Sequence, residues 1–464
     1  MHTIGQGLEW GALTREASSL YEQGDYDSAA VVAESALQLA ESALSPDAPE
    51  LADALGDLAV VLQAQGQYSA AEPIYRRALA IRENSSGPDT EDVARTLDNL
   101  ADLCQAQGRY TEAEPLRERV LAISEKIYGL DHVYVALSLD SLARLHDAQG
   151  RYAAAEPLHA RSLAIREKAL GTDHPDLAPT LDALAELRYG RGQYADAEPL
   201  FERALAIREK ALGPDHPAVA TSLGNLAGLY FAQGQYSHAE QLYKRALAIQ
   251  EEALGESHLD AAISLNGLAV LCSVQGRHAE AEVLYERSLA IREKELGPDH
   301  PDVATSLGNL ALLLDAQGRY EDAEPLHKRA LAIRENTLGP GHPHVATSLD
   351  NLAELYRAQS RFAEAEPLYE RALAIGEKTL GPDHPDVALS LDNLAGLFRA
   401  QGRFGEAETL YRRALEIQEK ALGVDHPDVA VSLDGLAQVY RAQSRVTDAE
   451  PLSERADAIR AVKR

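Results

Sequence analysis

The chain has 464 residues, of which 45% are apolar and 25% charged, and its formal net charge is −29 with a pI near 4.9. This excess of carboxylates disfavours nucleic acid and anionic membranes as partners, because both require clustered Lys and Arg. The start of the chain, MHTIGQGLEWGAL, has no Lys or Arg before Arg15, and no later window approaches a membrane-spanning apolar run. We therefore expect a soluble, cytoplasmic protein without a targeting segment.

The stretch LGPDHPDVATSL, residues 296–307, returns along the chain at a spacing of 42 residues or a multiple of 42. A fixed period of this kind indicates a stack of similar units and overrides a domain count based on length. We expect one domain over residues 1–464, made of an N-terminal capping unit (1–44), nine 42-residue units (45–422) and a C-terminal unit (423–464). The histidines of the motif and of its looser copies are His132, His174, His216, His258, His300, His342, His384 and His426.

The unit from Pro217 to Gly255 shows apolar residues at three and four spacing on both sides of the sequence AQGQ. This pattern predicts helix A over about 217–232 and helix B over about 236–254, with a tight turn between them. Gly234 and Gly255 suit the left-handed positions that end helices, and Pro217 suits a first helical turn. The predicted fold class is therefore all-α, a right-handed α-solenoid of about eleven helix-turn-helix units.

The repeated motif then reads as the joint between two helices. Gly297 ends one helix, Pro298 prevents its continuation, Asp299 or His300 caps the next helix and Pro301 begins it. A metal site is the alternative, but packed helices lie roughly 8–10 Å apart and zinc holds nitrogen ligands at about 2.0–2.1 Å. Histidines of successive units could not share one ion, so we expect no metal.

The chain has two cysteines, Cys104 and Cys272, which lie four repeats apart and cannot form a disulfide with each other. Both take the slot that holds Tyr230 and Tyr356 in other units. We expect small buried hydrophobic side chains there, in preference to redox chemistry, and a reducing compartment.

The spacing of small and large residues in the unit resembles the tetratricopeptide repeat pattern, with Leu in its Trp slot and Ala in its first Gly slot. The matching residues are Leu223, Leu226, Ala227, Tyr230, Ala239, Tyr243 and Ala246. The 42-residue period is similar to the repeats of kinesin light chains, and the resemblance covers nearly the whole chain. Kinesin light chains carry a coiled coil before their repeats, which this sequence lacks, so we do not expect a motor subunit.

The resemblance implies that helix A lines a concave groove and that asparagines between its two leucines hold the backbone of an extended peptide. An amide suits this role because it both donates and accepts hydrogen bonds. Duplication of near-identical units alone would also explain the recurring amides. The candidate asparagines are Asn99, Asn225, Asn266, Asn309, Asn351 and Asn393.

Neighbouring groove positions divide into acidic early units, apolar middle units and late units with arginines. The further candidates are Asp98, Asp350, Asp392, Arg357, Arg399, Arg441, Leu312 and Val270. They suggest a ligand with a basic segment, an apolar anchor and acidic residues toward the late arginines. The alternative is that these charges only solvate helices.

Several residues depart from the pattern. Arg188 and His146 stand in the slot of Tyr230, and Arg117, His159 and His327 in the slot of Tyr243. We expect Arg188 to extend to solvent or to pair with a carboxylate, and buried histidines to have partners. In the last helix, Ser453 and Asp457 replace inward apolar residues and predict a polar capping face.

The leading functional hypothesis is a non-enzymatic scaffold that binds a protein or peptide segment, favoured as a monomer. Self-association as an assembly module is the second hypothesis. An enzyme or metal protein is the third, and the phosphate-loop, zinc-protease, nucleophile-elbow and C-x-x-C motifs that would support it are missing from the sequence. We expect no cofactor and no catalytic residue.

Overall fold

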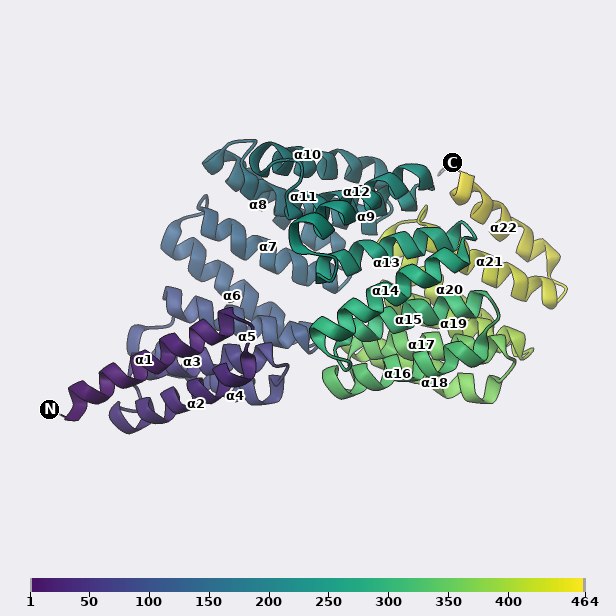
Figure 1. The fold of residues 1–464 in the computed structure, drawn as a ribbon. Helices are drawn as coiled ribbons and strands as arrows, with labels where there is room; N and C mark the ends of the chain where they lie inside the picture. The colour runs from purple at the N-terminus through teal and green to yellow at the C-terminus, as the bar shows by residue number, and fades with distance from the viewer. Residues whose placement is uncertain (1, 462–464) are drawn as a thin grey trace. The chain divides into compact units, whose positions relative to one another are not determined.

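The computed structural model describes residues 2–461, and side chains from Trp10 onward; Met1 and residues 462–464 lie outside this part. Within it the chain forms paired antiparallel α-helices with short turns, as Figure 1 shows. Each pair is one predicted unit, with an odd-numbered helix A and an even-numbered helix B. The helices are α1 (His2–Glu22), α2 (Tyr26–Ala43), α3 (Pro49–Ala64), α4 (Tyr68–Ser86), α5 (Glu91–Ala106), α6 (Tyr110–Tyr128), α7 (Val133–Ala148), α8 (Tyr152–Leu170), α9 (Ala178–Gly190) after the short 3-10 helix η1 (Pro175–Leu177), α10 (Tyr194–Leu212), α11 (Pro217–Ala232), α12 (Tyr236–Leu254), α13 (Leu259–Val274), α14 (His278–Leu296), α15 (Pro301–Ala316), α16 (Tyr320–Leu338), α17 (Pro343–Ala358), α18 (Phe362–Thr379), α19 (Pro385–Ala400), α20 (Phe404–Leu422), α21 (Pro427–Ala442) and α22 (Val446–Ala461).

The joints between units are helix punctuation, as the sequence predicts. In α11 the helix begins at Pro217, and the Nδ1 atom of His216 accepts a hydrogen bond from the backbone N–H of Ala218 at 3.1 Å. The other seven motif histidines make the same bond to the residue two positions on. Each ring therefore satisfies one of the N–H groups that a helix start leaves without an intrahelical partner.

The turn within each unit requires a left-handed residue. Gly234, between α11 and α12, has a φ of 75°, and Gly255 after α12 has a φ of 95°. In two units serine takes the turn position, and Ser360 and Ser444 are the non-glycine residues with positive φ in the described chain. A side chain at such a position is strained, because Cβ crowds the carbonyl oxygen.

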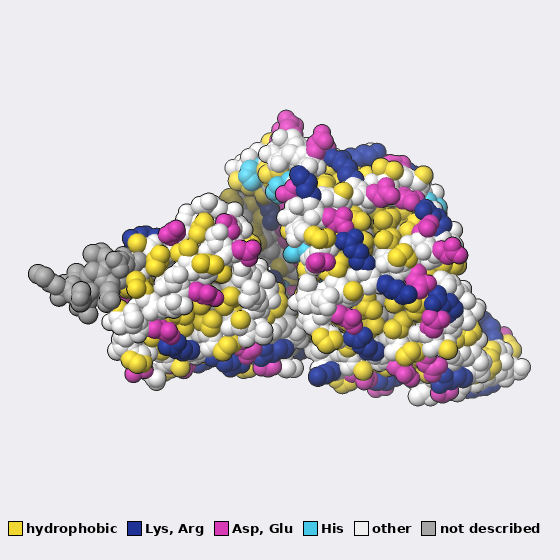
Figure 2. All heavy atoms as spheres, turned by 60° about the horizontal axis from the view of Figure 1, so that its bottom comes forward, with side chains coloured by type: hydrophobic (Ala, Val, Ile, Leu, Met, Phe, Trp, Pro, Cys, Tyr) yellow, Lys and Arg dark blue, Asp and Glu magenta, His cyan; other side chains and the backbone are white. Residues whose placement is uncertain are grey.

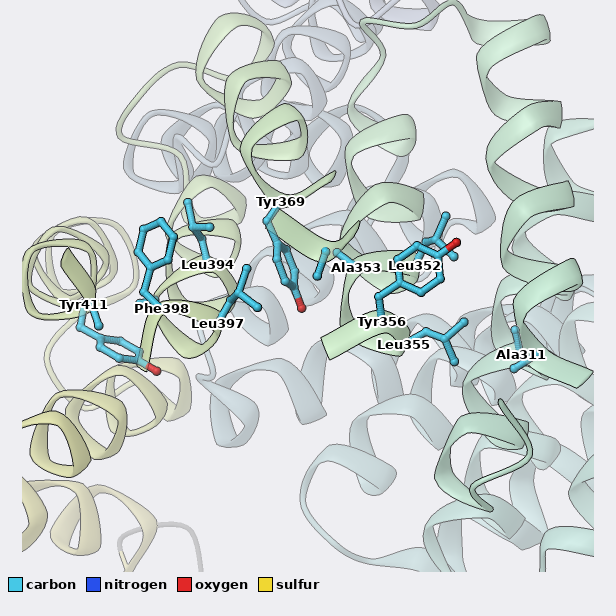
Figure 3. Close-up of a cluster of buried hydrophobic side chains, with 14 of the residues drawn as sticks. Ala311, Leu352, Ala353, Leu355, Tyr356, Tyr369, Leu394, Leu397, Phe398 and Tyr411 are labelled. Carbon is cyan, nitrogen blue, oxygen red and sulfur yellow. The ribbon is translucent and has the colours of Figure 1, made fainter. Parts of the chain in front are cut away.

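Buried side chains fill the space between neighbouring helix pairs in a series of clusters, and the main cluster extends from α13 to α22. Tyr369 of α18 lies between Ala353 of its own helix A and Leu397 of the next helix A, as Figure 3 shows. Its ring is fully buried, and its hydroxyl donates a hydrogen bond of 2.8 Å to Glu354. Cys104 and Cys272 are buried thiols in two separate hydrophobic clusters, which confirms their expected apolar role.

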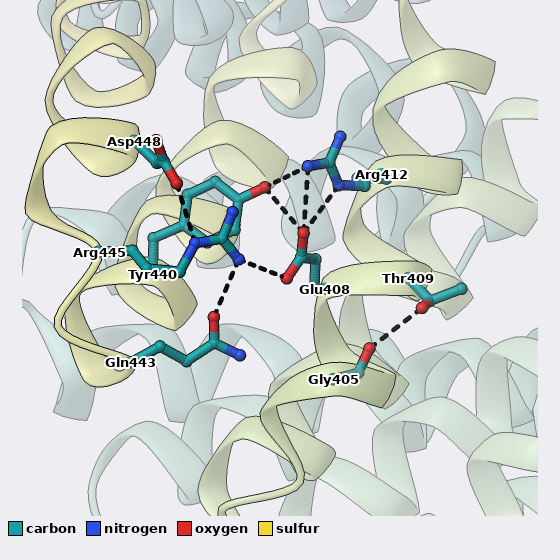
Figure 4. Close-up of polar contacts among 8 residues, drawn as sticks. All are labelled: Gly405, Glu408, Thr409, Arg412, Tyr440, Gln443, Arg445 and Asp448. Carbon is teal, nitrogen blue, oxygen red and sulfur yellow. Dashed lines mark hydrogen bonds and ion pairs between the residues drawn. The ribbon is translucent and has the colours of Figure 1, made fainter.

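Ion pairs repeat along the B helices and connect successive units. Arg445, which directly precedes the last helix B, lies 2.9 Å from Glu408 of the preceding helix B, and Glu408 also accepts from Tyr440 and Arg412 (Figure 4). The same pair recurs as Arg361 with Glu324 at 2.8 Å, where the guanidinium and Lys328 lower the pKa of Glu324 to about 2. Single exposed pairs contribute little, but a repeated network fixes the register of neighbouring units.

The A helices lie close to one another along the stack. Close approaches join α11 with α13, α15 with α17, α17 with α19 and α19 with α21, in addition to the packing of each A helix against its flanking B helices. Successive B helices are linked instead through long side chains, such as Arg413 and Glu377 at 2.6 Å. Here we call the solvent-facing side of the A helices the A-helix face.

The chain divides into two compact parts, residues 1–145 and 146–464, which from here on are called the first unit and the second unit and each contain several helix pairs. The single continuous domain therefore stays a prediction.

Within the second unit, the turn between α7 and α8 reaches the joint before α19. A Cβ atom placed on Gly150 would lie 2.7 Å from Cδ of Pro385 and 3.1 Å from the His384 ring, so only glycine fits at this contact. His384 is accordingly buried, whereas the side chain of His300 in the matching joint is 40% exposed.

Candidate protein-binding face

The six candidate asparagines all lie on A helices and are half-buried. Asn99 belongs to the first unit, and the other five lie in the second unit, on α11, α13, α15, α17 and α19. Asn309 donates a hydrogen bond of 2.8 Å to the side-chain oxygen of Asn266, so two amides of adjacent repeats are coupled. An amide has two donor hydrogens and an acceptor oxygen, and this bond leaves hydrogen-bonding capacity on both residues.

Asp98, in the first unit, does not present an unpaired charge. Its carboxylate pairs with Arg117, which also pairs with Asp102. Arg117 takes the slot that holds a tyrosine in other repeats. Its side chain is buried and lies against the two carboxylates. The structure thus brings Asp98 together with Arg117, a pairing that the sequence analysis does not predict.

Among the residues that the structure describes, neither Asp350 nor Asp392 has a basic partner. In other units an arginine of helix B serves this position, and Arg208 lies 2.6 Å from the matching Asp182. Gly376 and Gln418 replace that arginine in the units of Asp350 and Asp392. Burial, opposed by a hydrogen bond from Ser390, raises the pKa of Asp350 to about 7.

The environment of Asp392 is similar. Its carboxylate accepts hydrogen bonds from the Ser432 hydroxyl at 2.6 Å and from the Gln418 amide at 3.0 Å. Burial raises the pKa of Asp392 to about 7 in spite of these two bonds. Both aspartates therefore join adjacent A helices through serine hydroxyls and change charge near neutral pH.

The three late arginines occupy equivalent positions on α17, α19 and α21 but have different partners. Arg357 pairs with Glu354 of its own helix, with Nε 2.7 Å from the carboxylate. Arg399 lies beside the Tyr411 hydroxyl, and Arg441 donates a hydrogen bond of 2.6 Å to the Ser453 hydroxyl. The guanidiniums thus share one face of three successive A helices.

The apolar candidates lie on α13 and α15. Val270 is half-buried and packs against the main core cluster, whereas Leu312 is 42% exposed. Ile263, nearer the start of α13, is 62% exposed. On the face of the molecule drawn in Figure 2, such apolar side chains are interspersed with both signs of charge.

Two tyrosines that the sequence pattern assigns to the core pack between the A helices of adjacent repeats. Tyr243 lies against Gly228 and Gly267, and Tyr411 against Gly396 and Gly435; a Cβ on Gly267 would lie 2.5 Å from the Tyr243 ring, and one on Gly435 would lie 2.9 Å from the Tyr411 oxygen. The signal that could have revealed them is glycine at both flanking A-helix positions.

The departures from the repeat pattern have partners. Nε2 of His159 lies 3.0 Å from Asp147, and Nε2 of His327 lies 2.8 Å from Asp315. Arg188 pairs with Glu156 at 2.6 Å, which confirms the expected carboxylate partner. Over residues 10–461, whose side chains the structure describes, no three His, Cys, Asp or Glu side chains are grouped in a way that could hold a metal ion.

A separate open cavity of about 720 Å³ lies within the second unit. It is lined by the turn from Arg191 to Asp196 and by the joint from Leu422 to His426. None of the candidate asparagines or late arginines lines it. None of the helices in the described range is long and apolar enough to cross a bilayer.

Comparison with known proteins agrees with this geometry. A family model described as "Tetratricopeptide repeat" matches residues 11–84, 92–168, 148–210, 176–252, 224–294, 260–336, 316–378, 344–420 and 389–460. No curated protein matches the chain.

Three solved structures are similar to parts of the chain. Two of them contain the nearly identical TPR-like repeats of a proposed kinesin light chain from Podosopora anserina, and one of these two is the structure of a variant with a single substitution. Each is 33% identical and covers 44% of this chain, with 97% and 98% of its own length matched and TM-scores of 0.38 and 0.37.

The third structure is BtubC (BKLC) from P. vanneervenii. It is 27% identical, covers 50% of this chain and 93% of its own, and has a TM-score of 0.41. The family model, in contrast, extends over most of the sequence. The chain belongs to the tetratricopeptide repeat family.

Proposed function

We propose that this chain is a non-enzymatic, cytoplasmic scaffold, which binds an extended peptide or protein segment along the A-helix face of its second unit. Tetratricopeptide arrays are generally protein–protein interaction modules. The observation that supports the finer proposal is the row of half-buried amides at Asn225, Asn266, Asn309, Asn351 and Asn393. An extended backbone offers donors and acceptors in alternation, and a row of amides can match both.

The residues around the amides add selectivity to this proposal. Leu312 and Ile263 offer exposed apolar contacts in the middle of the row, where an apolar side chain of the partner would lose contact with water. The basic segment suggested by the early acidic residues has less support, because Arg117 and Arg208 already pair with the nearest carboxylates. The proposed ligand is therefore defined by its backbone, an apolar anchor and the late arginines.

A triple variant tests the proposal. We expect Asn309, Asn351 and Asn393, all changed to Ala, to weaken capture of protein partners in affinity purification from the source cells by about tenfold or more. Each lost amide removes hydrogen bonds to the ligand, and each such bond has a net contribution of about 0.5–1.5 kcal/mol. Thermal unfolding should change little, since these side chains are only half-buried.

The matched control changes Gln241, Lys378 and Thr409 to Ala, which removes three exposed polar side chains from B helices. This control should retain the partners recovered with the wild type. Equal loss of partners in both triple variants would show that the A-helix face is not the binding surface. Retained partners with a large drop in thermal stability of the asparagine variant would contradict the proposal as well.

A further inference from the structure

A contact in the second unit joins segments that are far apart in the sequence. The turn between α7 and α8 lies against the joint before α19, where a Cβ on Gly150 would be 2.7 Å from Cδ of Pro385 and 3.1 Å from Nε2 of His384. Gly150 has a φ of 64°, so the turn requires glycine for its backbone as well as for its space. Here we call this contact of Gly150 with His384 and Pro385 the seam.

The seam closes the helix pairs between α8 and α18 into a loop. Along this stretch each helix packs against the next, and A helices of adjacent repeats approach each other, as α11 and α13 do. The B helices are linked through long side chains instead, such as Arg371 and Glu335 at 2.6 Å. The A helices therefore lie on the inner side of the loop.

One repeat further along the chain, the two surfaces part. Gly192 and His426 lie 42 residues after Gly150 and His384 and are the next pair in the same register. The segments that carry them line the open cavity of about 720 Å³. The loop is therefore held closed over a small area at Gly150, where a change in one side chain can open it.

His384 is the side chain of the seam that can change its charge. It is 6% exposed, whereas His174, His258 and His300 in equivalent joints are 39%, 43% and 40% exposed. Its Nδ1 atom accepts a hydrogen bond of 3.0 Å from the N–H of Asp386, so the proton of the neutral ring is on Nε2. Nε2 is buried at the seam and makes no hydrogen bond of normal geometry.

A second proton on this ring acts against the closed seam in two ways. A protonated Nδ1 cannot accept from the N–H of Asp386, and a positive charge at a helix start is unfavourable. The charge is also kept from water by Gly150 and Pro385. Burial lowers the pKa of His384, and the Asp386 carboxylate and the Ala148 backbone oppose this effect. The closed form thus binds the proton more weakly than a form with the ring in water.

The other charged and titratable groups around the seam come from the α7–α8 turn, its two helices and the joints before α19 and α21. They are His146, Asp147, Arg151, Tyr152, Asp386 and Asp428. His146 and Arg151 bond to Gln149 of the turn. Burial, and then the nearby carboxylates, raise the pKa of Tyr152 above its ordinary value of 10, so the phenol stays neutral where histidine titrates.

We propose that the seam is an acid-opened latch: the neutral His384 ring holds the loop of the second unit closed, and its protonation releases the α7–α8 turn from the joint before α19. As the pH falls below 6.5, the ordinary histidine value, the ratio of closed to open molecules should fall by up to about tenfold per pH unit, until the pKa of the closed form is reached. Opening differs from acid unfolding, because Asp350 and Asp392 hold their protons more tightly in the folded chain.

Electron paramagnetic resonance distances across the seam test the latch in the full-length chain. Nitroxide labels are attached to Ala153→Cys of α8 and Lys378→Cys of α18, both exposed positions, while the native Cys104 and Cys272 are buried. From about pH 7.5 to about pH 5.5 we expect the ratio of short to long distances to fall about threefold or more. The far-UV circular dichroism should not change, since the helices stay folded.

His384→Asn separates the latch from other effects of acid. The amide oxygen can cap α19 as the imidazole nitrogen does, but it takes up no proton, so this variant should stay closed at both pH values. His300→Asn makes the same change in an exposed joint and should respond to acid as the wild type does. The absence of an acid response in the wild type, or an equal response in His384→Asn, would overturn the proposal.

Gly150→Val tests the contact without a change of pH. The new side chain would meet Pro385, so the loop should open in neutral solution as well. Gly234→Val has the same left-handed strain, but a Cβ there meets nothing within 4 Å, and its loop should stay closed. Equal distances in the two valine variants would show that the seam does not hold the loop. None of these outcomes depends on a bound peptide, so the latch and the proposed function can fail separately.

Discussion

Single side chains decide how the repeats of the second unit are joined at their A helices. In the unit of Asp182, Arg208 pairs with the aspartate and also bonds to Ser222 of the next helix A. In the position of Arg208, Gly376 has no side chain to make either contact. Gln418 in the same position bonds to both Asp392 and Ser432 but carries no charge. The result is a pair of buried carboxyl groups whose pKa values lie near 7.

These two groups make stability depend on pH. Their folded-state pKa of about 7 is above the ordinary value of 3.8, so the folded chain keeps protons that the unfolded chain has lost. Their contribution to the unfolding free energy is fully present below pH 3.8 and is lost as the pH rises through about 7. We expect urea denaturation at about pH 5.5–8 to show a falling midpoint, and a flatter profile in the variant with Asp350→Asn and Asp392→Asn.

Gly376→Arg gives an independent check on Asp350. The new guanidinium should lie beside Asp350 as Arg208 lies beside Asp182. It should lower the pKa of Asp350, and the urea midpoint should then depend less on pH, as in the Asp→Asn variant. Gly376→Ala is the control, since it adds a Cβ 3.2 Å from the Val387 side chain but no charge, and it should leave the slope of the pH profile unchanged. Parallel pH profiles in the wild type and in all variants would contradict this account.

At the scale of helices and turns, local residue chemistry allowed much of the fold to be predicted. The bounds of α11 and α12 agree with the predicted ranges, because Pro217, Gly234 and Gly255 act on the backbone where they stand. The same holds for the histidine caps. In contrast, the partners of Arg117 depend on how α6 lies against α5 within one helix pair, and the packing of Tyr411 between two glycines depends on how one helix pair is rotated against the next. The repeat pattern does not specify this rotation.

The turns supply a prediction at this scale. Ser360 and Ser444 adopt φ values of 60° and 63°, where other units have glycine. We expect Ser360→Gly and Ser444→Gly each to raise the unfolding free energy by roughly 0.5–1 kcal/mol, because the left-handed strain exceeds the entropic cost of glycine. Ser360→Ala keeps the strain and is the control. Chemical denaturation in which Ser360→Gly is no more stable than Ser360→Ala would contradict the prediction.

At the scale of the whole molecule, stability is a sum over neighbours. Each helix pair of the second unit buries its residues against the adjoining pairs, and the main core cluster extends from α13 to α22 without a single centre. The candidate A-helix residues are accordingly spread over many units, and the sequence could place them on one face but could not state which charges remain unpaired. That depends on which side chains of the neighbouring helices lie within reach, as Asp98 shows by its pairing with Arg117.

Leu226→Ala tests the nearest-neighbour view. Leu226 is 5% exposed and belongs to the same buried cluster as Phe201 and Leu229, so the change should cost about 2–5 kcal/mol. Hydrogen exchange followed by mass spectrometry should show faster exchange in α9–α14 and unchanged exchange in α1–α6. A uniform acceleration along the chain would show that the molecule unfolds as one cooperative body.

The contact of Gly150 with Pro385 has a consequence for how such a gene can change. Tandem near-identical segments readily gain or lose copies by unequal recombination, and most solenoids tolerate this because each copy touches only its neighbours. Here a 42-residue insertion or deletion between the two positions would bring a different joint against Gly150, or none. Copy number in this stretch should therefore be under selection, while it can vary more freely outside it.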